Sequence, residues 1–189
     1  MSENMNGMSA GNTADKTYAN TKYKDTFFRY LFKEKSGMLE LYNALFDDCL
    51  TDESEIEDCT IEDVFTRQMK NDLAFIIDTN LYLYEHQSTY NPNMPLRDLF
   101  YISSEYQKML DQKSLYSSSL QKIPTPNFIE FYNGSDPVCD VFEHRLSSAF
   151  EHPSGEPKLE LIVTVLNINE GHNALLMEHC KILREYAQY

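Results

Sequence analysis

The fold of this chain is decided by one stretch, KNDLAFIIDTNLYLYEHQSTYNPNMPLR, which runs from Lys70 to Arg97. Two apolar runs in it, residues 73–77 and 81–84, flank the polar residues 78–80. Short apolar runs on either side of a polar turn predict a β-hairpin. We therefore expect two adjacent antiparallel strands at the centre of the domain.

The register of this hairpin brings two acidic residues together. With the turn centred between Asp78 and Thr79, Asp72 lies directly opposite Glu85, because both are equally far from that centre. Opposed residues have Cβ atoms about 4.5–5.5 Å apart, so two carboxylates there repel each other unless a cation lies between them. Gln87 follows Glu85 by two residues and is expected on the same face of the strand.

Paired carboxylates of this kind indicate a divalent metal site. Mg²⁺ prefers oxygen ligands, keeps several waters and takes one or two carboxylates, and such a pair is typical of a metal-assisted phosphodiester hydrolase. A plainer interpretation stays open, in which Asp72 caps the start of a strand and Glu85 is a solvated strand residue. Acidic residues are depleted in strands, yet Glu85 ends an apolar and aromatic run, which favours the metal site.

The other segments predict an α/β domain with a mixed sheet flanked by helices. The expected helices cover residues 23–35, 38–46, 96–112 and 173–189, and further strands are expected over residues 60–68, 127–132 and 159–166. Gly37 is expected to separate the first two helices. Residues 47–58 are expected to form a solvated acidic loop, and residues 136–157 a variable loop with a short turn. The inner face of the third helix is expected to comprise Leu96, Leu99, Phe100, Ser103, Tyr106 and Leu110.

The net charge of −14 counts against general affinity for nucleic acid, because phosphate contacts need Lys and Arg. Half of this negative charge lies in residues 47–58, which hold seven acidic residues and no basic one. The distribution of the basic residues leaves room for a local basic rim around the hairpin. The residues concerned are Lys22, Lys24, Arg29, Lys33 and Lys35 in the first helix, with Arg67, Lys70 and Arg97 near the acidic pair.

The remaining features predict one cytoplasmic domain. No apolar run is long enough for a membrane span, no secretory signal is recognisable, and the four cysteines lack the spacing of a zinc site or disulfide framework. Residues 1–21 are expected to be a disordered leader, followed by one domain over residues 22–189. The last helix has no stop signal, so we expect a domain that is shortened at its C-terminal end.

Aromatic residues and a histidine near the acidic pair allow two interpretations. His86 is expected on the face opposite Glu85, where core packing is its natural role. Tyr82, Tyr84 and Tyr90 are able to stack on bases, although strand tyrosines more often serve as packing residues. The sequence alone leaves both interpretations of the tyrosines open.

The hairpin pattern, Asp-x(12)-Glu-x-Gln, resembles the PD-(D/E)xK nuclease superfamily, with Gln at the position where Lys is usual. Residues 22–32, KYKDTFFRYLF, resemble the opening helix of that superfamily, and the string Glu-His-Gln-Ser-Thr-x-Asn-Pro is specific. With residues 131–134, 146–147 and 167–169, the chain is similar to the recombination-promoting nuclease and transposase branch. The resemblance covers about residues 22–189 and implies roles in DNA recombination, mobile elements or defence.

The resemblance implies a restriction-endonuclease-like core and a Mg²⁺-dependent DNA endonuclease, with Mn²⁺ as a substitute ion. Asp72 and Glu85 would hold the metal ion, and the main-chain carbonyl of His86 would add an oxygen ligand. Gln87 would orient the attacking water or the phosphate, although an amide cannot ionise as the usual Lys does. An alternative stays open, namely a catalytically inactive nuclease-fold module that binds DNA or a protein and allows a homodimer.

Lys70 and Arg97 are the candidates for substrate binding, because the acidic pair needs positive charge to accept a phosphate. Arg97 lies in the first turn of the expected helix, where a cation is disfavoured by the helix macrodipole by about 0.3–1 kcal/mol. This placement indicates a carboxylate or phosphate partner. An ordinary ion pair with Asp98 or Asp72 is an equally good interpretation.

Overall fold

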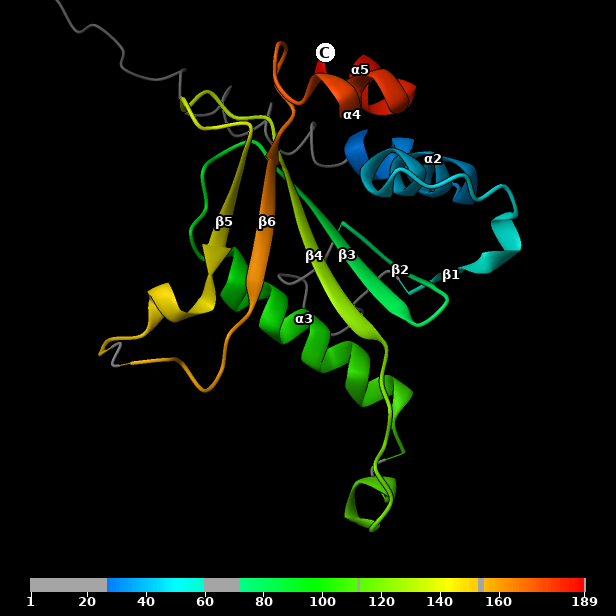
Figure 1. Ribbon diagram of the computed structural model, residues 1–189, viewed down its shortest axis with the longest axis vertical. Coiled ribbons are helices and arrows are strands. Elements are labelled where there is room, and N and C mark those ends of the chain that lie inside the picture. The colour runs from blue at the N-terminus through cyan, green and yellow to red at the C-terminus, as the bar shows by residue number, and fades with distance from the viewer. Residues whose placement is uncertain (1–26, 60–71, 112, 153–154, 189) are drawn as a thin grey trace, which may run out of the picture.

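The computed structural model describes residues 27–59, 72–111, 113–152 and 155–188, which contain a mixed six-stranded sheet with helices on both faces (Figure 1). The expected α/β class, a mixed sheet flanked by helices, is therefore confirmed. The strands are β1 (Ile56–Asp58), β2 (Leu73–Ile77), β3 (Asn80–Gln87), β4 (Thr125–Tyr132), β5 (Val141–Arg145) and β6 (Ile162–Asn167). The helices are α2 (Lys35–Phe46), α3 (Met94–Met109), α4 (Ala174–His179) and α5 (Lys181–Ala187), with short 3₁₀ turns η1 (Glu53–Glu55), η2 (Ser114–Tyr116) and η3 (Leu146–Ala149); residues 27–31 are also helical.

Strands β2 and β3 form the predicted hairpin in the predicted register. Ile77 pairs with Asn80 across a two-residue turn, and Asp78 adopts the left-handed conformation, with φ 55°. Short hairpin turns favour such positive φ values, because their twist then matches that of the strands. Continuing the register beyond β2 by one residue places Asp72 opposite Glu85.

The sheet order is β1-β2-β3-β4-β6-β5. Strands β1, β2 and β3 are antiparallel neighbours, β3, β4 and β6 run parallel, and β5 pairs antiparallel with β6 at the edge. Parallel neighbours need a crossover connection, and α3 lies in the connection between β3 and β4. The helix that follows the hairpin is thereby carried across one face of the sheet.

Helices α2, α4 and α5 cover one face of the sheet, and α3 crosses the other (Figure 1). Side chains of β3 alternate between the two resulting cores. Tyr82 and Tyr84 belong to the core beneath α2 and α5, whereas Leu81 and Leu83 belong to the core beneath α3. By the same alternation Glu85 lies on the α3 face. No helix within the described ranges is both long and apolar enough to cross a bilayer.

The break between the first two helical segments lies at a different position from the expected one. Gly37 lies inside α2, and the interruption falls at residues 32–34, so the prediction that Gly37 separates two helices is wrong. A Cβ atom at this position would lie only 3.1 Å from the carbonyl oxygen of Leu31. The glycine therefore permits a close approach between α2 and the preceding segment.

Two strands occur where loops were expected. Strand β1 lies within the acidic residues 47–58, because Ile56 is buried and pairs with Ile77 of β2. Strand β5 lies within residues 136–157 and covers the edge of β6. The loop predictions are wrong for these strands, and the expected strand over residues 60–68 lies outside the described part of the chain.

The C-terminal residues form two short helices instead of one. Cys180 has extended backbone angles, with φ −115° and ψ 99°, and separates α4 from α5. The carboxylate of Glu40 on α2 accepts the N–H of Ile182 at 3.1 Å and so caps the first turn of α5. Leu176, Cys180 and Leu183 are buried.

The buried face of α3 is rotated from the expected one. Leu96, Leu99 and Tyr106 pack partly buried against the core, as predicted, but the prediction is wrong for Phe100 and Ser103. Phe100 is exposed, whereas Asp98 and Glu105 are buried. A hydrophobic pattern cannot reveal a face that contains two acidic residues. The buried residues of the helix are Met94, Pro95, Asp98, Tyr101, Ile102 and Glu105.

Candidate functional site

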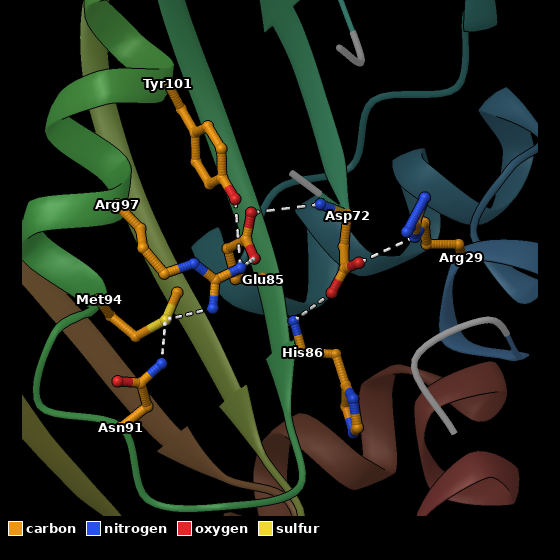
Figure 2. A network of polar contacts seen from close by, with 8 residues as sticks. All are labelled: Arg29, Asp72, Glu85, His86, Asn91, Met94, Arg97 and Tyr101. Atoms are coloured by element: carbon orange, nitrogen blue, oxygen red, sulfur yellow. Dashed lines mark hydrogen bonds and ion pairs between the residues drawn. The ribbon is translucent and has the colours of Figure 1, made fainter. Parts of the chain in front are cut away.

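Asp72 and Glu85 lie next to each other where β2 begins (Figure 2). The main-chain N–H of Asp72 donates to Oε1 of Glu85 at 3.2 Å. Both residues are buried. The prediction that these acids oppose each other is confirmed, and the interpretation of Glu85 as a solvated residue is wrong.

Each of the two carboxylates is held by an arginine from a different helix. Nε of Arg29 lies 2.9 Å from Oδ1 of Asp72. Nη2 of Arg97, in α3, lies 3.2 Å from Oε2 of Glu85. Figure 2 shows the Asp72 carboxylate directed toward Arg29 and the Glu85 carboxylate directed toward α3. Sequence reasoning placed Arg29 in a basic cluster but did not pair it with Asp72.

The environment of Glu85 opposes its ionisation. Burial raises the pKa of Glu85 well above its usual value, and the carboxylates of Asp72 and Asp98 raise it further. The guanidinium of Arg97 and the N–H of Asp72 act in the opposite direction. A buried carboxylate without such partners costs several kcal/mol, so Arg97 is the main compensation for a charge on Glu85.

Two further buried acids surround Glu85, and sequence reasoning missed both. Glu130 of β4 is the register partner of Glu85 and is 1% exposed. Among the described residues, neither carboxylate oxygen of Glu130 has a hydrogen-bond partner. Burial raises the pKa of Glu130 to about 8 and that of Asp98 to about 7. Glu130 lies in an apolar and aromatic strand, so the signal that singled out Glu85 would have found it as well.

Arg97 has the carboxylate partner that its place at a helix N-terminus predicts. The partner is Glu85 and not Asp98 or Asp72, so the specific ion pairs that we expected are wrong. Nη2 of Arg97 also lies 3.2 Å from the hydroxyl of Tyr101. The Arg97 side chain remains 33% exposed, which leaves it accessible to a ligand from solvent.

The ring of His86 packs in the core, as predicted. It stacks on Phe28 with ring centroids 5.2 Å apart, and its Nε2 lies 2.8 Å from the hydroxyl of Tyr186 on α5. Tyr82 and Tyr84 are also buried. Their packing interpretation is therefore correct, and neither is available to stack on a base.

The main chain of His86 faces the acidic pair. Its N–H donates to Oδ2 of Asp72 at 2.8 Å. The carbonyl of Gln87 accepts a hydrogen bond from the main-chain N–H of Asn133, so it points toward β4. The main-chain groups of successive strand residues point to opposite sides of the strand. The carbonyl of His86 therefore points toward the β2 side, where Asp72 lies.

Gln87 shares the face of Glu85 and is half-buried. Its side-chain amide makes no hydrogen bond to the described residues, so its donors and acceptor are open to a ligand. Lys70 and Arg67 lie outside the described residues. The structure thus brings together Asp72, Glu85, Gln87, Arg97 and the main chain of His86.

Comparison with known proteins assigns no family to the chain. No family model matches it, and no curated protein resembles it in sequence. Across the described ranges, no three His, Cys, Asp or Glu side chains are grouped so that they would hold a metal ion. Any function must therefore be argued from the acidic pair and its surroundings.

Proposed function

We propose that this protein is a metal-dependent DNA endonuclease of the PD-(D/E)xK type, with Asp72 and Glu85 as the metal-binding acids. The observation that carries the proposal is the contact between these two residues at the start of a buried hairpin. Burying two acids side by side is costly unless positive charge compensates them. The order of helix, antiparallel strands, helix and parallel strand agrees with the core that the family resemblance implies.

The donor atoms suit Mg²⁺ or Mn²⁺. Mg²⁺ keeps several waters and needs only one or two carboxylates, so the carboxylates of Asp72 and Glu85 suffice without a third acidic side chain. The carbonyl of His86 points to the same side and would add an oxygen. All three donors are hard oxygen ligands, which is the chemistry that these ions prefer.

The side chains around the pair would position the reactants of hydrolysis. A bound cation would polarise the scissile phosphate and lower the pKa of water. Gln87 would orient the attacking water, because its amide both donates and accepts hydrogen bonds but cannot take up a proton. The water oxygen would bond to phosphorus as the bond to the leaving sugar oxygen breaks, and solvent would take the proton of the water and protonate the leaving oxygen.

Arg97 has two uses in this scheme. Its guanidinium neutralises Glu85 while the acidic pair holds no other cation. A divalent ion competes with Arg97 for Glu85, and the partly exposed guanidinium is then free to bind a phosphate, for which arginine has the right fork geometry. Lys70 remains the second candidate for substrate binding.

Plasmid nicking in Mg²⁺ and Mn²⁺ tests the proposal with conservative variants. Asp72→Asn and Glu85→Gln keep the side-chain size but lose charge, and Glu143→Gln on exposed β5 is the matched control. A cation contributes several kcal/mol to such a reaction, so we expect at least about a 100-fold loss in the first two variants. Equal nicking by all four proteins would rule the site out.

The alternative is a nuclease-fold module that binds DNA or a protein partner, including a second copy, without turnover. The observation that favours it is that Arg29 and Arg97 already neutralise both acids, while Gln87 replaces an ionisable Lys. This function predicts no cleavage by the wild-type protein with either metal ion. Retained DNA binding in the same samples would then support it.

A further inference from the structure

An aromatic group lies on the α3 face of the sheet, outside the acidic pair. Tyr90 lies in the connection between β3 and α3, and Phe142 and His144 lie on β5. The Tyr90 ring is within 18° of parallel to that of Phe142, with centroids 6.2 Å apart. It meets the His144 ring nearly edge-on at 5.1 Å. Tyr90 is 47% exposed, in contrast to the buried tyrosines of β3.

His144 brings an unsatisfied polar atom to this group. The residue is 6% exposed, and its Nε2 finds no hydrogen-bond partner in the part of the chain that the structure describes. Burial lowers the pKa of His144 and so favours the neutral ring. An unpaired buried nitrogen is unfavourable, and the ring that carries it is in contact with the half-exposed ring of Tyr90.

The aromatic group shares its sheet face with the acidic pair. Phe142 pairs with Val165, Val165 pairs with Glu130, and Glu130 pairs with Glu85. The two sites are therefore three strand spacings apart, which is about 14 Å. A single DNA strand covers this distance with a few nucleotides.

We propose that Tyr90 is a stacking platform for an unpaired base of the DNA strand that is cleaved at Asp72 and Glu85. The inference rests on the proposed function and names its substrate class, DNA with unpaired bases. Phe142 lies against the Tyr90 ring, which still leaves nearly half of Tyr90 open to solvent. Bases inside a duplex are already covered on both sides, so the exposed ring selects a base that is unpaired.

The net charge of the protein counts against a binding mode that relies on phosphate contacts alone. At a net charge of −14, phosphate attraction contributes little to affinity. Stacking of a base on an aromatic side chain contributes about 1–3 kcal/mol without any basic residue. Tyr90 therefore supplies affinity that the electrostatics of this chain do not.

The chain contains no tryptophan, which permits a direct fluorescence test. In Tyr90→Trp the new indole is the only one, and a short oligothymidylate in EDTA should quench it by stacking. Tyr116→Trp is the matched control, because Tyr116 lies on η2, away from the acidic pair, and is 93% exposed. Equal quenching in the two variants, or none in Tyr90→Trp, overturns the proposal.

A binding series separates stacking from simple packing. Tyr90→Phe keeps the ring and should bind the oligonucleotide like the wild-type protein. Tyr90→Leu keeps apolar bulk without a ring and should bind about 5- to 100-fold more weakly, with an unchanged thermal midpoint. Wild-type affinity in Tyr90→Leu overturns the proposal, as does a wild-type protein that fails to bind.

Cleavage assays on the same proteins distinguish this inference from the proposed function. If Tyr90→Leu cleaves single-stranded DNA like the wild-type protein while Asp72→Asn does not, the stacking platform fails and the nuclease function stands. If Tyr90 stacks on bases but no protein cleaves in Mg²⁺ or Mn²⁺, the nuclease function fails and the platform stands as part of a binding module.

Discussion

Glu85 and Glu130 are register partners on parallel strands, yet within the described ranges Glu85 has a guanidinium partner and Glu130 has none. Asp98 lies nearby, so three buried carboxyl groups are close to Arg97. Burial raises the pKa of all three acids. The local charge therefore changes within the pH range in which the protein would act.

Replacing Glu130 with Gln should stabilise the protein at high pH. The pKa of Glu130 in the folded protein, about 8, lies above the ordinary 4.5. As pH rises from about 4.5 to 8, the unfolded chain releases a proton that the folded chain keeps, so stability falls. One pKa unit is worth about 1.4 kcal/mol. The wild-type protein should therefore lose on the order of 3–5 kcal/mol of unfolding free energy over this pH range, and Glu130→Gln should not.

Denaturant titrations at pH 5 and pH 8 measure this effect. The gain in the free energy of unfolding should be larger at pH 8, because most of the wild-type loss develops between pH 5 and pH 8. Glu143→Gln, on an exposed strand residue, is the control. An equal gain at both pH values would contradict the buried, protonated Glu130.

Removing Arg97 should destabilise the protein mainly through Glu85. Arg97→Ala leaves buried carboxylates without their compensating charge, and we expect a loss of about 1–3 kcal/mol at neutral pH, because the partly exposed pair is screened by solvent. Glu85→Gln should recover part of this loss in the double variant. A double-mutant cycle of unfolding free energies measures the coupling, and strict additivity would show that the contact contributes nothing.

Removing the hydroxyl of Tyr186 should weaken the packing of α5. In Tyr186→Phe the Nε2 of His86 loses a buried partner at 2.8 Å, which should cost about 1–3 kcal/mol. Tyr116→Phe removes an exposed hydroxyl and should change nothing. Equal unfolding free energies for the two variants would show that this hydrogen bond does not stabilise the fold.

The cap that α2 provides for α5 can be tested at Glu40. Glu40→Ala removes the acceptor for the Ile182 N–H and should cost about 0.5–2 kcal/mol, as the loss of a helix cap does. Glu40→Gln keeps an acceptor and should lose less. The difference between the thermal midpoints of the two variants separates the effect of the hydrogen bond from that of the side-chain charge. An unchanged thermal midpoint in Glu40→Ala would refute the cap.

The central hairpin was predictable because its signals are local. The turn between Asp78 and Thr79 fixes the register, and the register alone places Asp72 opposite Glu85. The core position of His86 follows from the same alternation. These predictions needed no knowledge of the rest of the chain.

The rest of the site depends on contacts between distant segments. Arg29 reaches Asp72 from a helix more than forty positions earlier in the chain, and no sequence periodicity encodes that approach. Asp98 lies on a helix face that the hydrophobic pattern misplaces, because acidic residues are part of it. Glu130 carries the same local signal as Glu85, but its place beside Glu85 depends on a parallel pairing through a crossover.

His86 connects the acidic pair to the last helix by two contacts. Its main chain holds Asp72 on one side, and its ring holds Tyr186 of the last helix on the other. Lifting α5 away would withdraw the hydroxyl from the imidazole and loosen the strand position that fixes the acid. A shift of α5 would therefore be transmitted through His86 to the position of Asp72.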